Sequence, residues 1–482
     1  MPALVRPRTD SRNTTEPPAP IPEPLAWEPL ARATGVVRSR ADVSRGWSPM
    51  SALDRMLWRN TDFRRFFAGQ FVTNAGDSLY TVAMLWLAFE LSGSTLVTGA
   101  LNAILLLPWL LQVFAGPLVD RLALERVLVG SQVIQGTVVL ALPLAAATGH
   151  LHVGALFAVA PVLMLASLLM APMETALLPR IVDDERLPGA NAALSIVTLG
   201  LDMVFDALGG GFVAVFGPTT LFLVDSATFA VAALLFAGIK IGTATGTDER
   251  TEPRNEQAPA TVRSVLRSYV SDLRDGVRVL RGTVFVELIL TTAVANFTTG
   301  VALAILPAFG DGLGGPAVYG LLLGALGIGR LVGSFIGPWF ETVPYGRMLL
   351  VHGLGACCWL AAVLVSSLAL TVVLFGLAWV PVGASSVLSS TLNQRVFPTD
   401  LLGRVSATKG TASGATLPLG SLVGGAVAEV LGTTPTMALT AGGFGFTAIY
   451  VLLRPRLRRL PAVTAATPAD FDVETATEQE DE

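Results

Sequence analysis

The sequence predicts an all-α membrane protein with twelve transmembrane helices in two pseudo-symmetric halves of six. Three observations predict this fold class. Of the 482 residues, 52% are hydrophobic and only 14% are charged, against ~25% charged residues in soluble proteins. The apolar residues gather in runs of about 20, the length that crosses a ~30 Å hydrocarbon layer as a helix. A short charged turn in the first half of the chain also recurs in the second half.

The repeated turn indicates an internal duplication. The two copies lie 221 residues apart, each between two long apolar runs. A glycine, a proline, an acid and an arginine fall in register: Gly116, Pro117, Asp120 and Arg126 in one copy, and Gly337, Pro338, Glu341 and Arg347 in the other. Asn74 likewise falls opposite Asn296. We expect each half to carry one such turn between its second and third helices.

The predicted helices follow the apolar runs in order. In the first half they cover residues 66–90, 96–118, 126–147, 153–173, 190–216 and 219–239. In the second half they cover residues 284–309, 317–340, 346–366, 369–391, 407–431 and 434–453. These spans divide the chain into a disordered N-tail (1–57), an N-terminal half (58–239), a cytoplasmic linker (240–283), a C-terminal half (284–453) and an acidic C-tail (454–482). We expect the proline-rich N-tail and the chain after Arg459 to be disordered, because neither can bury a core.

The linker is predicted to end in an amphipathic helix. Apolar residues recur there every three or four positions, with arginines between them: Val262, Leu266, Tyr269, Leu273, Val277 and Leu280. We expect this helix to lie on the cytoplasmic membrane face, with its arginines near anionic lipid headgroups.

The distribution of basic residues predicts the topology. Cytoplasmic loops carry an excess of Lys and Arg. If both termini are cytoplasmic, all but one of the 32 Lys and Arg residues fall in cytoplasmic segments, and the exception, Arg330, lies inside a predicted span. We therefore expect a multi-pass protein of the plasma membrane with an even number of spans and both ends inside the cell.

Sequence signals for an enzyme are absent, so we expect neither catalytic residues nor cofactors. There is no Gly-x-x-x-x-Gly-Lys-Ser/Thr motif, so ATP is not expected to drive the protein directly. The three histidines and the adjacent Cys357 and Cys358 lack the spacing of metal ligands. We expect no metal and no nucleic-acid partner.

The turn Gly116-x-x-x-Asp120-Arg121 resembles the signature between helices two and three of the major facilitator superfamily. Within that superfamily the chain, over about residues 57–455, is most similar to drug and siderophore exporters of the macrolide-efflux and enterobactin-exporter type. The motifs that carry this resemblance are Phe63-Arg64-Arg65-Phe66, Gly76-Asp77, Asp225-Ser226-Ala227-Thr228-Phe229, Asp275-Gly276-Val277-Arg278, Leu306-Pro307, Tyr319-Gly320 and Gly403-Arg404-Val405. The resemblance implies a secondary transporter that is complete as a monomer.

The chain departs from the superfamily pattern at two places. After Arg121 it reads Leu122-Ala123-Leu124-Glu125-Arg126, where the pattern has a glycine and paired basic residues. In span five, Phe205-Asp206-Ala207-Leu208 replaces the Gly-Pro that precedes Gly-Gly in antiporters. The second departure leaves uptake by symport open.

Charges inside the spans are the main candidates for proton coupling. A charge at mid-bilayer costs ~2.5–3.5 kcal/mol on the insertion scale, so it requires a partner or a water-filled site. The candidates for coupling are Asp77, Asp202, Asp206 and Arg330. Asp202 and Asp206 share a helix face, and the superfamily fold packs helix five against helix eight. We therefore expect an Asp202–Arg330 ion pair, either switching during transport or static.

The remaining candidates concern the substrate and the gate. Asp77 is expected to bind a proton or a cationic substrate, or to have a structural hydrogen bond. Asn74, Asn296 and Asp225 are candidates for the substrate cavity, with helix–helix hydrogen bonds as the alternative for the two asparagines. By resemblance, the cytoplasmic gate consists of Gly116, Asp120, Arg121, Arg126, Glu341 and Arg347.

These observations favour a proton-coupled exporter of a small amphipathic compound, such as a drug, antibiotic or siderophore. The spans are rich in Leu, Val, Phe and Trp and poor in fixed charge, which suits an apolar substrate. Two alternatives stay open: a proton-coupled uptake symporter, and a non-transporting sensor or scaffold on the same fold.

Overall fold

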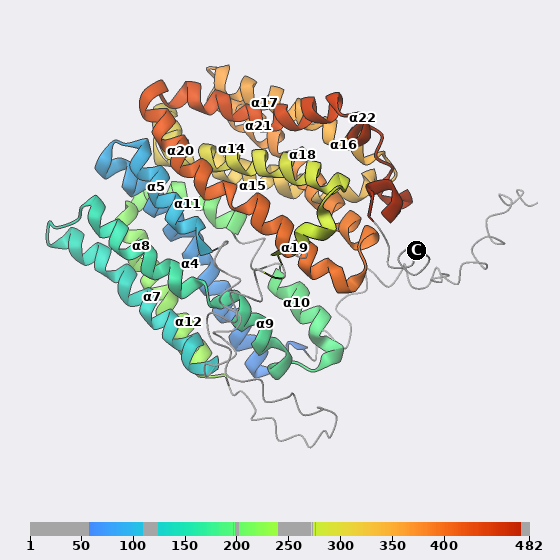
Figure 1. Ribbon diagram of the computed structural model, residues 1–482. Helices are drawn as coiled ribbons and strands as arrows, with labels where there is room; N and C mark the ends of the chain where they lie inside the picture. Colours follow the sequence, from blue (N-terminus) through green and yellow to red (C-terminus); the bar gives the residue numbers. More distant parts are fainter. Residues whose placement is uncertain are drawn as a thin grey trace, which may run out of the picture. The chain divides into compact units, whose positions relative to one another are not determined.

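The computed structural model is helical throughout the part of the chain that it describes (Figure 1). The chain divides into two units, Met1–Arg55 and Met56–Glu482, and every described residue belongs to the second. Among these residues there is no strand, only one isolated bridge between Pro344 and Ala462. The described residues are 57–108, 124–195, 197, 202–239, 271, 273–274 and 276–473.

The helices follow the predicted apolar runs, some of which consist of two consecutive helices. The first half contains α4 (Thr61–Ser92), α5 (Thr95–Leu106), α7 (Leu124–Ala147), α8 (Val153–Ser167), α9 (Met170–Ile181), α10 (Leu187–Ser195), α11 (Asp202–Phe216) and α12 (Pro218–Ala237). The second half contains α14 (Val284–Leu313), α15 (Pro316–Ile336), α16 (Tyr345–Leu350), α17 (His352–Leu364), α18 (Leu368–Val396), α19 (Thr399–Gly414), α20 (Thr416–Leu431) and α21 (Thr433–Leu453). Short 3-10 turns, η2 (Asp184–Arg186) and η4 (Gly337–Phe340), join some of them.

The predicted all-helical membrane fold is confirmed. Nine helical segments of the described chain are long and apolar enough to cross a membrane. The count of twelve stays a prediction, since the span expected at 96–118 runs from α5 into residues 109–123, outside the described part.

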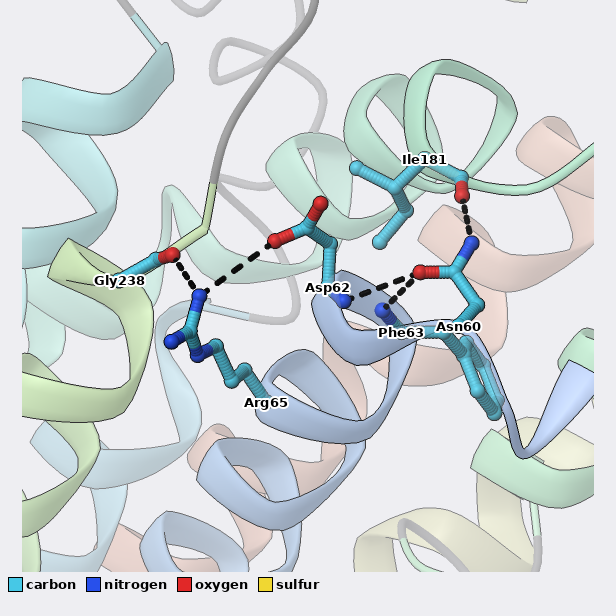
Figure 2. A network of polar contacts seen from close by, with 6 residues as sticks. All are labelled: Asn60, Asp62, Phe63, Arg65, Ile181 and Gly238. Carbon is cyan, nitrogen blue, oxygen red and sulfur yellow. Dashed lines mark hydrogen bonds and ion pairs between the residues drawn. The ribbon is translucent and has the colours of Figure 1, made fainter.

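A polar network fixes the start of α4 and includes Arg65 of the Phe63-Arg64-Arg65-Phe66 motif (Figure 2). Asn60 caps the helix by accepting hydrogen bonds from the backbone N–H groups of Asp62 and Phe63 at 3.0 and 3.1 Å. The Asn60 amide also donates to the Ile181 carbonyl at the end of α9, at 2.6 Å. Arg65 lies 3.7 Å from the Asp62 carboxylate and donates to the Gly238 carbonyl just after α12. The start of α4 is thereby tied to the ends of α9 and α12.

Three hydrophobic cores show how the two halves meet. One core is built from both halves and includes Val82, Leu101, Val301 and Leu322. The other two each belong to one half only: one contains Phe63 and other first-half residues, and one contains only residues from Leu280 onward. We call the end of the bundle where α4 turns into α5 the joined end, and the opposite end, where α4 begins, the split end. The halves share a core at the joined end and have separate cores at the split end.

Glycines allow two helices of the second half to approach closely. Gly329 and Gly333 of α15 lie against the α18 backbone carbonyls of Gly376 and Val380. A side chain at either position would collide with that backbone, so the α15–α18 contact depends on small residues.

The C-terminal segment differs from expectation. Residues 455–473, which we call the C-terminal strap, are ordered and contain α22 (Pro455–Arg458), η5 (Val463–Ala465) and η6 (Pro468–Phe471). Phe471 is fully buried and stacks on Phe285 with ring centroids 5.2 Å apart. The prediction of disorder after Arg459 is therefore wrong for residues 460–473, because a few apolar side chains anchor an otherwise polar segment.

The predicted linker helix lies mostly outside the described residues, as does the N-tail up to residue 56. Its described end packs on the protein, with Gly276 directly against Thr408 of α19. Leu280 is buried, whereas Val277, placed on the same apolar face by the sequence pattern, is exposed.

Candidate functional site

A buried carboxylate lies between α4 and α12 in the first half. The side chain of Asp225 is fully buried in the middle of α12. Its Oδ1 accepts a hydrogen bond from the Thr228 hydroxyl at 3.2 Å and lies close to the Cα of Gly76 on α4. Its Oδ2 is buried and has no hydrogen-bond partner within the described part of the chain. The next residue along α4, Asp77, is half-buried, so the structure brings two predicted site residues together.

A second group of polar side chains joins α4 to α7 and α9, nearer to the split end. Gln70 donates a hydrogen bond to the Glu174 carboxylate at 3.0 Å, and Thr73 donates to the Gln132 side chain at 3.1 Å. Glu174 was missed in the sequence analysis because the predicted fourth span stopped at residue 173. The helical stretch continues to Ile181, which places this acid within a membrane-length helix.

The expected contact between helices five and eight is present as α11 against α15. Gly210 lies directly against Gly320, and the predicted alternation of the spans makes helices five and eight antiparallel. Asp202 lies eight residues and Arg330 ten residues from this contact, so at 1.5 Å per residue their backbones differ by only about 3 Å in depth. The side chains of Asp202 and Asp206 lie outside the described part, and no ion pair links Arg330 to a described side chain. The Asp202–Arg330 pair therefore stays a prediction.

The two matching asparagines have different hydrogen bonds. Asn74 donates to the Gln70 carbonyl on its own helix at 2.7 Å. Asn296 donates to the Ser413 carbonyl on α19 at 2.9 Å, a helix–helix bond within the second half. The Asn296 side chain thus makes the helix–helix hydrogen bond that was the alternative to a place in the substrate cavity.

Only part of the predicted gate can be located. Gly116, Asp120 and Arg121 lie outside the described residues, and the Arg126 side chain is exposed. In the second copy, Arg347 is exposed and the Glu341 carbonyl accepts a hydrogen bond from the Thr464 backbone N–H of the C-terminal strap at 3.2 Å. The strap therefore contacts the second gate turn directly.

The joined end contains polar contacts between the halves that the sequence analysis did not find. The Glu429 carboxylate of α20 accepts hydrogen bonds from the Ser94 hydroxyl and, at 3.3 Å, from the Leu96 backbone N–H. Ser94 is the N-cap of α5, so this acid supports the N-terminus of a helix in the other half. About two turns deeper, Asn102 donates to the Ser421 hydroxyl at 2.9 Å. Two side-chain hydrogen bonds thus connect the halves at this end, between residues that are 319 and 335 positions apart in the sequence.

Two helical halves joined at one end, with the acidic side chain of Asp225 buried inside the first half, are the architecture of a multi-pass membrane transporter of the two-half type. The chain belongs to the family described as transmembrane secretion effector, which matches residues 50–479. This family is part of the major facilitator superfamily, so the protein is a transporter by family and not an enzyme.

Relatives and solved structures agree with this assignment. An uncharacterized MFS-type transporter, YvqJ, of Bacillus subtilis (strain 168) is 25% identical over 306 residues, covering 62% of this chain and 69% of the relative. A bacterial homolog of the human lysosomal transporter Spinster, inward-facing and unoccupied, has a TM-score of 0.59 at 13% identity, over 83% of this chain and 97% of that chain. A bacterial homologue of the iron transporter ferroportin, in an inward-facing state, has a TM-score of 0.59 at 15% identity, over 81% and 98% of the two chains. At these identities the two structures bear on the fold alone.

Proposed function

We propose that this protein is a proton-driven exporter that moves a small amphipathic organic compound, such as a drug, an antibiotic or a siderophore, across the plasma membrane by alternating access. The observation that carries this proposal is the arrangement of the hydrophobic cores. The two halves share a core at one end and have separate cores at the other. By rocking about a central site they can close the separated end and open the joined end.

The orientation of this arrangement follows from the basic residues. The positive-inside rule puts the split end, with its arginine-rich loops, in the cytoplasm. The two halves are then in contact at the outer end and separate from each other at the cytoplasmic end. This is the state in which an exporter takes up its substrate. Two of the similar solved structures are likewise described as inward-facing.

Export is favoured over uptake by two independent observations. The family that the chain belongs to is described as a secretion effector. The motifs around Phe63-Arg64-Arg65-Phe66 and Asp225-Ser226-Ala227-Thr228-Phe229 resemble those of macrolide and enterobactin exporters. Within this proposal, Asp77, Asp202, Asp206 and Arg330 are coupling candidates, Asn74 is a candidate for the substrate cavity, and the two charged turns form the cytoplasmic gate.

Inside-out vesicles with an imposed pH gradient, acid inside, test the proposal. We expect fluorescent amphipathic dyes or antibiotics to accumulate in vesicles that contain the protein, and an uncoupler to release them. Asp202→Asn is expected to reduce this accumulation at least tenfold if the coupling pair lies in α11. The matched control is Asp311→Asn, because Asp311 is an exposed acid at the joined end of α14. Accumulation only under the opposite gradient would contradict export and favour uptake.

A further inference from the structure

We propose that the carboxyl group of Asp225 is a proton-binding site sealed inside the first half, between α4 and α12. This inference rests on the proposed function and deepens it, because it places one coupling proton within a half rather than at the α11–α15 contact between the halves.

The surroundings of Asp225 do not support a permanent negative charge. The side chain has no exposed surface, its Oδ2 has no hydrogen-bond partner within the described part of the chain, and its Oδ1 receives one hydroxyl hydrogen bond. A buried carboxylate without a compensating cation is strongly destabilised, and such a group becomes neutral by taking up a proton. Asp225 is thus poised to hold a proton in this conformation.

The titratable neighbours support the same conclusion. Among the described helices, α4, α7 and α11 pack against α12. Asp77 and Tyr80 lie in the middle of α4. Each is close enough to Asp225 to interact with its carboxylate electrostatically. Helix α7 carries titratable groups only in its first turn, at Glu125 and Arg126, and the acids of α11 are Asp202 and Asp206. None of the titratable groups in the middle of these helices is basic.

A proton fits the site better than a metal ion. Hard cations such as Mg²⁺ and Ca²⁺ take about six or more oxygen ligands. Among the described residues, the Thr228 hydroxyl is the group that hydrogen-bonds to the carboxylate. Gly76 fills the space on the α4 side with backbone rather than with a further donor.

Helix α4 connects this site to the joined end. Gly209 of α11 packs against Val82, six residues beyond Gly76 on α4, and Trp86 stacks on Tyr319 of the other half with ring centroids 6.2 Å apart. Loss of the proton from Asp225 would place a charge against the backbone of α4 beside Asp77. We therefore expect the protonation state to shift α4 and, with it, the contact between the halves.

Infrared difference spectroscopy of the purified protein tests this inference without a known substrate. Spectra recorded between acidic and alkaline pH should contain the C=O stretch of a buried protonated carboxylic acid. We expect this band to disappear in Asp225→Asn and to persist in the control Asp311→Asn. An unchanged band in Asp225→Asn would overturn the proposal.

Two further measurements keep the result interpretable. If Asp225→Asn does not fold, Thr228→Val removes the hydroxyl that bonds the carboxyl group, and we expect the band frequency to shift; an unchanged frequency would overturn the proposal. In vesicles, Asp225→Asn should lose gradient-driven transport at least tenfold and keep gradient-independent exchange of the same dye. If the wild-type protein has the titrating band but no gradient-driven transport, the proposed function alone is refuted. If it has gradient-driven transport but no band, this inference alone is refuted.

Discussion

Two adjacent glycines in α11, Gly210 and Gly211, have opposite surroundings. A Cβ atom at Gly210 would collide with Gly320 and the Pro316 carbonyl of the other half, whereas a Cβ at Gly211 would meet no atom within 4 Å. Overpacking a close contact costs about 1–3 kcal/mol. We therefore expect Gly210→Ala to weaken closure of the joined end and Gly211→Ala to leave it unchanged.

Spin labels at the joined end would measure this difference. Leu96 and Val430 are suitable positions, because their side chains are 41% and 83% exposed and they belong to opposite halves. In a background without Cys357 and Cys358, Gly210→Ala should shift the distance distribution between the labels toward longer distances. Identical distributions for both glycine variants would show that this contact does not determine closure.

The acids inside the spans could be predicted from the sequence, but their contacts could not. Asp77 and Asp225 could be predicted as acids inside membrane spans, because a charge inside an apolar run is visible in the sequence alone. Their proximity could not be predicted, since it depends on the register of α4 against α12. The Ser94–Glu429 contact was missed for the same reason: each residue lies at a helix end, where polar residues are common, and 335 residues separate the two.

At the scale of elements, the helices were predictable and the attachment of the chain ends was not. Periodic apolar runs predict helices strongly, and the α11–α15 contact followed from the resemblance to a known fold. The C-terminal strap has no periodic pattern, and it is held by a few sparse side chains such as Phe471 and Val463. Its order arises from the apolar surface that Phe285 and Phe397 offer, with ring centroids 4.6 Å apart, which only the folded second half presents.

The strap is therefore expected to stabilise the second half. Phe471 is fully buried, and truncation of a buried Phe to Ala typically costs about 3–5 kcal/mol. Phe471→Ala should lower the unfolding midpoint of the purified protein in a thermal or denaturant titration. Phe335→Ala is the matched control, because that side chain is 74% exposed and should change the midpoint little. Equal midpoints in the two variants would mean that the strap adds no stability.

At the scale of the whole molecule, the separate cores at the split end and the common core at the joined end predict that transport requires the joined end to open. A covalent link across Ser94 and Glu429, whose side chains are in hydrogen-bond contact between the halves, should hold it closed. We expect Ser94→Cys with Glu429→Cys, in a background without Cys357 and Cys358, to lose transport at least tenfold on oxidation and to regain it on reduction.

A second cysteine pair separates this effect from general rigidity. Lys409 donates a hydrogen bond to Asn393 at 2.6 Å, and both residues belong to the second half. Because the halves move as units in alternating access, a link between Asn393→Cys and Lys409→Cys ties two helices that do not separate, so oxidation should change transport little. If transport continued at its full rate with the Ser94–Glu429 link closed, the joined end would not be a gate, and the substrate would have to cross the membrane by a route that leaves the common core intact.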